Sequence, residues 1–207
     1  MKATFFFLLT GSVLFFGSCK KDNTSSIGGS QSPIGMVGET VTSSSGSIDG
    51  VGSISGTVTT LSDGVSTFTG SALVTNTAIK NILANSALVQ IDGDNVSIEA
   101  VKVKFTSEGI ESFGPLEPGI IAKFSSATGD TYPCGTGKRS VTSVSTTDDY
   151  FWGGMMIKVM SVEETPNKFG VKKIVYYSNH KWGLVAVEFT FDDNSVATFP
   201  VYSSTSN

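Results

Sequence analysis

The residues best suited to ligand recognition form the segment Asp148-Asp149-Tyr150-Phe151-Trp152, which two glycines follow. Aromatic rings offer an apolar face to the C–H groups of a sugar, while carboxylates accept hydrogen bonds from its hydroxyls. Consecutive side chains of an extended strand point to opposite faces, so at least one of the three rings must be exposed unless the chain turns. We predict that Asp148, Asp149, Tyr150 and Trp152 belong to a ligand-binding surface, with glycan as the ligand class.

A second group of aromatic residues lies nearer the C-terminus. Tyr177 and Trp182 flank His180, the single histidine of the sequence, and we predict that both rings join the ligand-binding surface. The structural alternative is a core of large side chains between two layers of sheet, with Trp152 and Trp182 at its centre. An exposed turn accounts for His180 without a chemical role.

Catalytic and metal-binding patterns are sparse. The sequence has no Cys-x-x-Cys pair, no His-Glu-x-x-His motif and no phosphate-binding loop, so no catalytic residue, metal site or cofactor is predicted. Two oxygen-rich stretches, Asp92–Asn95 and Asp192–Asn194, suit tight hairpin turns. A calcium site would need about 6–8 oxygen ligands. We predict turns at both stretches.

The composition points to a β protein and away from nucleic acid. The chain has 207 residues, a formal net charge of −4 and no basic cluster, which argues against a nucleic-acid partner. Valine, isoleucine, phenylalanine and tyrosine outnumber the helix-forming residues, as is typical of β-sheet.

Short apolar or alternating stretches recur along the chain between glycine, aspartate and proline residues. The Asp63-Gly64 pair predicts a hairpin turn between the first two of them. We predict strands at Ser53–Thr60, Ser66–Val74, Leu88–Ile91, Val96–Phe105, Ile120–Phe124, Thr131–Tyr132, Ser140–Val144, Met155–Val162, Val171–Tyr177, Leu184–Phe191 and Ala197–Tyr202.

One helix is predicted, from Asn76 to about residue 86. Asn76 or Thr77 caps it, and its apolar residues recur on one face. Many short strands with regular punctuation predict a mainly β fold, an antiparallel β-sandwich, with a barrel or a β-prism as the alternatives.

The N-terminal residues have the pattern of an export signal. Met1-Lys2 is positive, and the apolar stretch that follows, to Phe16, is shorter than the ~20 residues that span a bilayer. Phe16-Gly17-Ser18-Cys19 resembles a lipobox, and the Cys-Lys-Lys-Asp continuation is similar to lipoproteins of the Bacteroidetes group. The resemblance implies that residues 1–18 are removed, that Cys19 is lipidated, and that the protein is anchored to the outer membrane on its periplasmic or cell-surface face.

A second resemblance covers less than a tenth of the chain. Val187-Glu188-Phe189-Thr190-Phe191-Asp192-Asp193 resembles a hairpin of jacalin-like lectins, although the glycine pair that follows the turn in those lectins is missing. This resemblance implies a β-prism.

We therefore divide the chain into a signal peptide (1–18), a lipidated flexible tether (19–47) and a β domain (48–207). The tether is rich in Ser, Gly and Thr and has few apolar residues with which to order itself. The leading hypothesis is a membrane-anchored binding module of the envelope whose partner is a glycan. A structural or assembly component that binds another envelope protein comes second, and a glycan-active enzyme third.

Overall fold

The computed structural model describes residues 27–43, 49–84, 86, 88–113, 118–135, 137–166 and 170–204. The predicted signal peptide, Cys19 and the first part of the predicted tether lie outside these residues. Within them the chain is mainly β with one short α-helix, which confirms the predicted fold class.

The elements begin with a short 3-10 helix and a strand that both precede residue 48. In chain order they are η1 (Pro33–Gly35), β1 (Thr40–Ser43), β2 (Val51–Ser62), β3 (Val65–Val74), α1 (Thr77–Leu83), β4 (Val89–Asp92), β5 (Asn95–Thr106), β6 (Gly109–Phe113), β7 (Gly119–Lys123), β8 (Thr131–Cys134), β9 (Gly137–Val144), β10 (Tyr150–Trp152), β11 (Met155–Ile157), β12 (Met160–Glu164), β13 (Val171–Asn179), β14 (Gly183–Phe191), β15 (Val196–Pro200) and β16 (Tyr202–Ser203).

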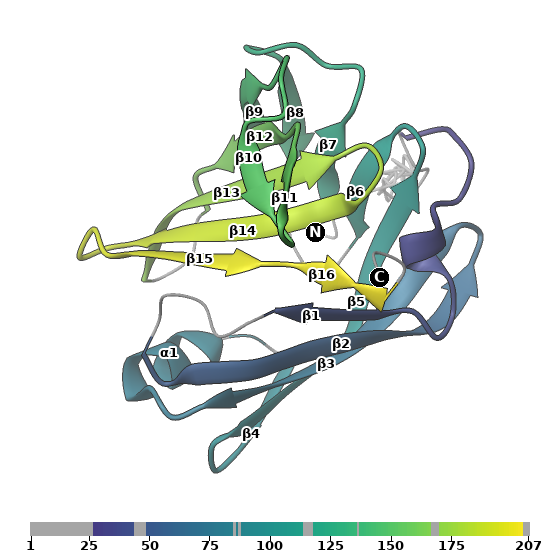
Figure 1. The fold of residues 1–207 in the computed structure, drawn as a ribbon. Helices are drawn as coiled ribbons and strands as arrows, with labels where there is room; N and C mark the ends of the chain where they lie inside the picture. The colour runs from purple at the N-terminus through teal and green to yellow at the C-terminus, as the bar shows by residue number, and fades with distance from the viewer. Residues whose placement is uncertain are drawn as a thin grey trace, which may run out of the picture.

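Apart from β10 and β11, the strands form one antiparallel sheet that closes almost completely into a barrel (Figure 1). The order along the sheet is β15-β14-β13-β12-β9-β8-β7-β6-β5-β3-β2-β1-β16, with β4 paired to β5 beside this path. Most neighbours follow one another in the chain because short turns connect antiparallel strands. Of the architectures considered from the sequence, the barrel is the one observed, rather than the preferred sandwich or the β-prism.

The C-terminal strands close the barrel. β15 pairs with β14, the chain passes through Val201, and β16 then pairs with β1, so that Thr42 lies opposite Tyr202. The backbone N–H of Val201 donates to the carbonyl of Val185 at 2.8 Å. One nearly continuous C-terminal segment therefore joins both edges of the sheet.

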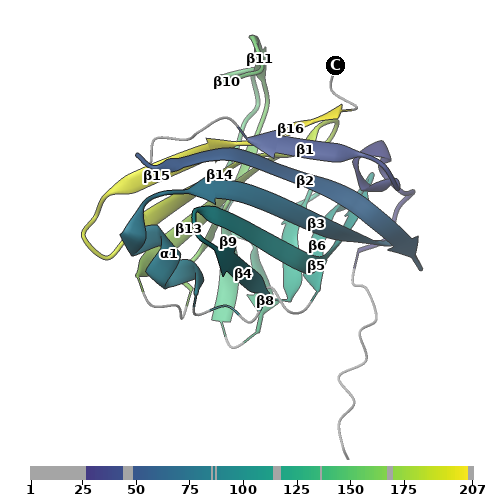
Figure 2. The ribbon, with the colours of Figure 1, turned by 90° about the horizontal axis from the view of Figure 1, so that it is seen from below.

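Two elements lie outside the barrel wall (Figure 2). Helix α1 covers one end of the barrel, and Asn76 caps it as predicted, its side-chain oxygen accepting from the N–H of Ile79 at 3.2 Å. The hairpin β10-β11 projects from the outer surface. It is held there because Trp152, Ile157 and other apolar residues of the segment pack around Val185, which is fully buried.

Several turns are those that the sequence predicts. Asp63 and Gly64 have φ values of 52° and 77° and join β2 to β3. The stretch 92–95 turns β4 into β5 with Gly93 at φ 60°, and at 192–194 the N–H of Ser195 donates to Asp193 at 2.9 Å. Asparagine, aspartate and glycine occupy these positions because they tolerate left-handed backbone or bond to it locally.

Residues 27–43, which the sequence analysis assigned to the tether, are part of the barrel. Ile27 and Ile34 are buried, Gln31 forms a bridge with Thr106, and β1 pairs with both β2 and β16. The folded domain therefore begins before residue 48. The few apolar residues here are too far apart to form a local pattern, and distant strands supply their partners.

Three further differences concern strand limits. The predicted strand Met155–Val162 is two strands, β11 and β12, that belong to different sheets, and the aromatic segment before it is strand β10. The predicted strand Ala197–Tyr202 is divided into β15 and β16. β6 was not predicted, because its polar Glu111 and Ser112 break the apolar pattern although both are buried.

Candidate functional site

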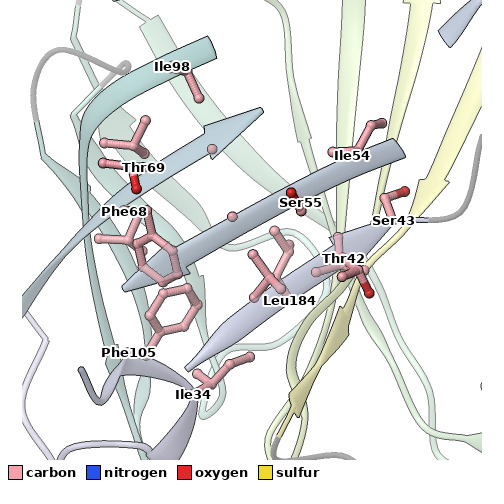
Figure 3. Close-up of a pocket in the computed structure, with 16 residues that line it drawn as sticks. Ile34, Thr42, Ser43, Ile54, Ser55, Phe68, Thr69, Ile98, Phe105 and Leu184 are labelled. Carbon is pink, nitrogen blue, oxygen red and sulfur yellow. The ribbon is translucent and has the colours of Figure 1, made fainter. Parts of the chain in front are cut away.

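An apolar cavity of about 250 Å³ lies inside the barrel (Figure 3). Phe68, Phe105 and Ile34 close one end of it, and Ile54 and Ser43 lie towards the other. The two phenylalanine rings meet edge to face with their centroids 5.8 Å apart. The wall comes from η1, five strands and one residue between strands: Ile34, Val41, Thr42, Ser43, Ile54, Ser55, Gly56, Phe68, Thr69, Gly70, Ile98, Val101, Val103, Phe105, Leu184 and Val201.

A second apolar cavity, of about 400 Å³, lies beneath helix α1. Ile79, Ile82 and Leu83 of the helix form its outer wall, and phenylalanine and valine side chains of β14 and β15 face them. Its lining is Ser43, Val51, Ile54, Ser55, Gly70, Ser71, Ala72, Val74, Ile79, Ile82, Leu83, Val89, Val96, Ile98, Val171, Val187, Phe189, Phe191, Phe199 and Val201.

Small residues at inward positions of β3 leave this space open. Alternate residues of a strand face the same side. On β3 the inward series runs from buried Phe68 through Gly70 and Ala72 to buried Val74. Phe68 fills the barrel where it stands, whereas Gly70 and Ala72 provide almost no side chain. Gly56 on β2 also contributes no side chain, and it allows Val41 to approach closely, because an added Cβ would lie 3.1 Å from Val41.

The other part of the barrel interior is filled. Tyr132, Met160 and Val162 pack there with buried alanine and valine. Beside them Arg139 and Glu164 lie opposite one another on β9 and β12, and each is almost completely buried. No cavity-lining residue named above belongs to this group, so the barrel has a packed side and a hollow side.

The buried ion pair on the packed side is satisfied by the protein itself. Arg139 Nε donates to Glu164 Oε2 at 2.7 Å, and its Nη1 donates to the carbonyls of Gly119 and Ile120 at 3.1 and 3.0 Å. The Tyr176 hydroxyl donates to the same Glu164 oxygen at 2.9 Å. Burial alone would lower the pKa of Arg139, but attraction to Tyr176 and Glu164 raises it above its ordinary value. This group therefore has a structural role.

The hollow side has a different chemistry. Among the described lining residues of both cavities none carries a charge, and the polar members are serines and threonines. Of the serines, Ser55 and Ser71 are exposed, and their hydroxyls lie 3.4 Å apart and have each other as partners. Apolar walls of this kind favour hydrocarbon over water and penalise any charged group placed between them.

A more polar hollow of about 470 Å³ adjoins the α1 end of the barrel. It shares Ile79, Ile82 and Phe191 with the cavity beneath the helix, and Asp49, Asp192 and Asp193 lie on its rim. Asp193 is held by Ser195, and the hydrogen bonds from that side chain and backbone lower the pKa of its carboxyl.

The structure brings the predicted aromatic residues together on the outer wall of the barrel. Tyr150 stacks on Tyr177 with the ring centroids 5.2 Å apart, and Trp152 lies 5.6 Å from Trp182 and 5.5 Å from Tyr202. Trp152 is only 3% exposed, and its indole N–H donates to the carbonyl of Val201 at 3.0 Å. These contacts hold the β10-β11 hairpin against the wall.

The remaining predicted site residues lie at the edge of this cluster. Asp148 and Asp149 are exposed, and Asp149 accepts a hydrogen bond of 2.7 Å from Ser145. The hydroxyl of Tyr177 faces Glu188 at 3.4 Å, and burial together with that carboxylate raises the pKa of Tyr177 to about 12. Lys181 Nζ lies over the Trp182 ring, 4.2 Å from its centroid.

Phe151 is the aromatic residue of this segment that exposes most of its ring, at 70%. It lies opposite Met156, which is 50% exposed, on the outward face of the hairpin. The expectation that at least one of the three consecutive rings is exposed is therefore confirmed. Ligand binding by the predicted set stays a prediction.

The residues that line the cavities were not among the predicted site residues. They are apolar or small and are scattered over eight strands and two helices, so no motif connects them. One feature of the sequence could have indicated them. On β3, Gly70 and Ala72 stand at alternate positions between the large apolar residues Phe68 and Val74, so that face of the strand has little side-chain volume in its middle.

Comparison with protein-family models, with curated proteins and with solved structures found no match to this chain. In the described part of the chain, no helix combines the length and hydropathy needed to cross a membrane. The same residues contain no group of three or more His, Cys, Asp or Glu side chains that could hold a metal ion.

Proposed function

We propose that this protein is an envelope lipoprotein, anchored through Cys19, whose barrel binds an apolar ligand in its hollow side. The observation that carries the proposal is the pair of apolar cavities of about 250 and 400 Å³. Sites for small molecules have volumes of about 300–1,000 Å³ and mostly apolar walls. Large cavities in a core cost stability, so a hollow of this size is expected to serve a purpose other than packing.

The proposal keeps the binding module inferred from the sequence and changes the class of ligand. Sugar recognition needs an accessible ring face next to polar groups. Trp152 is buried, and Lys181 lies over Trp182. The interior of the barrel, in contrast, offers hydrocarbon contacts on several sides of a ligand. An apolar molecule is therefore favoured over a glycan.

Binding of a neutral dye tests this proposal. Nile red, whose fluorescence rises in apolar surroundings, is titrated into the mature chain carrying Cys19→Ala, which has no lipid of its own. We expect saturable binding, with weaker binding by Ala72→Phe, because Ala72 lines the larger cavity. Leu73→Phe is the matched control, since Leu73 is the exposed neighbour on the same strand. Equal binding of Nile red by the two variants would argue against the cavity as the binding site. A separate glycan array tests the alternative ligand class.

A second candidate function is assembly with another envelope protein, and the exposed pair Phe151 and Met156 favours it. Exposed apolar side chains on a projecting hairpin are typical of protein interfaces. A photo-crosslinking residue at position 151, compared with one at exposed Lys102, tests this function in cells. A discrete adduct from position 151 alone is the expected result.

A further inference from the structure

The two cavities adjoin one another inside the barrel. They share six wall residues, Ser43, Ile54, Ser55, Gly70, Ile98 and Val201, which come from β1, β2, β3, β5 and the segment between β15 and β16. Because the same residues bound both spaces, they form a waist between two chambers. We call the space of about 250 Å³ the phenylalanine chamber and that of about 400 Å³ the helix chamber.

The chambers lie one after the other along the interior. Phe68, Phe105 and Ile34 close the far end of the phenylalanine chamber, and none of them lines the helix chamber. Ile82 and Leu83 of α1 lie at the far end of the helix chamber, and neither lines the phenylalanine chamber. The combined space is therefore elongated, with its two ends on different elements and its waist in the middle.

The waist accepts a hydrocarbon chain. Gly70 contributes no side chain to it, and no larger residue fits at this position, because an added Cβ would lie 2.9 Å from the carbonyl oxygen of Ser55. No described residue of either chamber carries a charge. A charged group at the waist would lose its hydration without an ionic partner, whereas methylene groups lose nothing.

We infer that the two chambers form a single site for one long, uncharged hydrocarbon chain that passes through the waist. This inference rests on the proposed function and adds the shape and charge of the ligand. A compact ligand of equal volume would fill one chamber and leave the other empty. An extended chain fills both and buries apolar surface along its whole length.

A series of straight-chain alcohols from octanol to hexadecanol, competing with Nile red on the mature Cys19→Ala chain, tests the inference. Affinity is expected to increase about fourfold per methylene, the equivalent of ~0.8 kcal/mol per buried CH₂. The increase should continue beyond the length that fills one chamber. Hexadecanol should bind with one molecule per protein.

Two variants that each fill one chamber sharpen the test. Ala72→Phe reduces the helix chamber and Val101→Phe the phenylalanine chamber, because each residue lines only that chamber. Both variants should bind hexadecanol at least tenfold more weakly than the unaltered chain. Both should still bind octanol in the remaining chamber, and this binding also shows that the variants are folded. Leu73→Phe, on the outer face, should bind the whole series like the unaltered chain.

The outcomes separate this inference from the proposed function. Two hexadecanol molecules per protein, or affinity that stops increasing at the same short chain length in all variants, would show two separate sites and overturn the inference alone. A weakening of hexadecanol by only one of the two filling variants would also overturn it. Absence of binding by the dye and by every alcohol would overturn the proposed function as well.

Discussion

At the scale of single residues, aromatic and charged side chains have mainly structural roles in this protein. Trp152 joins the hairpin, the barrel wall and the C-terminal segment through two ring contacts and one hydrogen bond. Arg139 and Glu164 form a buried pair with satisfied hydrogen bonds. The residues of the proposed ligand site are uncharged and mostly apolar, and the contribution of Gly70 and Ala72 is the absence of a large side chain.

Trp152→Ala is expected to reduce the free energy of unfolding by about 3–5 kcal/mol, because it removes a large buried side chain and leaves a cavity. Phe151→Ala, one residue earlier and exposed, should change it by less than about 0.5 kcal/mol. Urea titration of the mature Cys19→Ala chain measures both. A small effect of Trp152→Ala would mean that the aromatic cluster does not hold the hairpin.

Arg139→Met is expected to cost about 3–5 kcal/mol, since it leaves the buried Glu164 carboxylate without its cation. Arg139→Met combined with Glu164→Leu should cost less than the sum of the two single changes, because no unpaired charge remains. A double-mutant cycle from denaturant titrations gives the coupling energy. Additive effects would show that the two side chains stabilise the barrel independently.

At the scale of elements, the hollow side depends on one short helix and on the strands that close the sheet. Helix α1 has seven residues, too few to be stable alone in water, and it contacts the barrel through Ile79, Ile82 and Leu83. β16 is a two-residue strand that completes the wall by pairing with β1. Helix α1 lines the helix chamber, and Val201, which directly precedes β16, lines both chambers.

Asn76→Ala is expected to destabilise helix α1, because Asn76 caps its first turn and also donates to the carbonyl of Asp49 at 3.1 Å. Loss of such a cap costs about 0.5–2 kcal/mol. Asn76→Asp, which keeps a capping oxygen, should retain most of the stability. Amide hydrogen exchange of residues 77–84 measures the local effect, and equal exchange in the two variants would contradict it.

At the scale of the whole molecule, a hollow barrel joined to a lipid anchor would hold its ligand beside a membrane. The residues between Cys19 and Ile27 connect the predicted lipidation site to the first described residue. A bilayer is a source of hydrocarbon chains, and a site for one such chain close to it could receive or deliver a lipid. The predicted anchor would place the proposed ligand site beside that bilayer.

Cys19→Ala is expected to abolish lipidation and to release the protein from membranes, because no other residue of the lipobox pattern provides a thiol for acylation. Metabolic labelling with a palmitate analogue followed by membrane fractionation measures both effects. Cys134→Ala is the control, since Cys134 is a buried cysteine inside the barrel domain. Labelling of the Cys19→Ala protein at the normal level would disprove the lipobox assignment.

Local patterns were sufficient for the fold class, most strands and the helix. Alternation of apolar and polar residues predicts strands such as β3 and β5. The Asp63-Gly64 pair predicts the turn between β2 and β3, and Asn76 predicts the cap of helix α1. Each of these features depends only on residues that are close together in the sequence. The place of residues 27–43 in the wall was not predictable in this way, since β1 pairs with a strand at the opposite end of the chain.

Only the tertiary structure decided whether the strands form a barrel or a sandwich, and whether a ligand site exists. A strand pattern shows which residues face inward, but it does not show which strand meets which. Closure follows from the pairing of β16 with β1. Gly70 and Ala72 could have faced a large residue from across the barrel and left no space. They line the chambers instead, because the pairing of distant strands, and not the sequence of any one strand, sets which side chains stand across the interior.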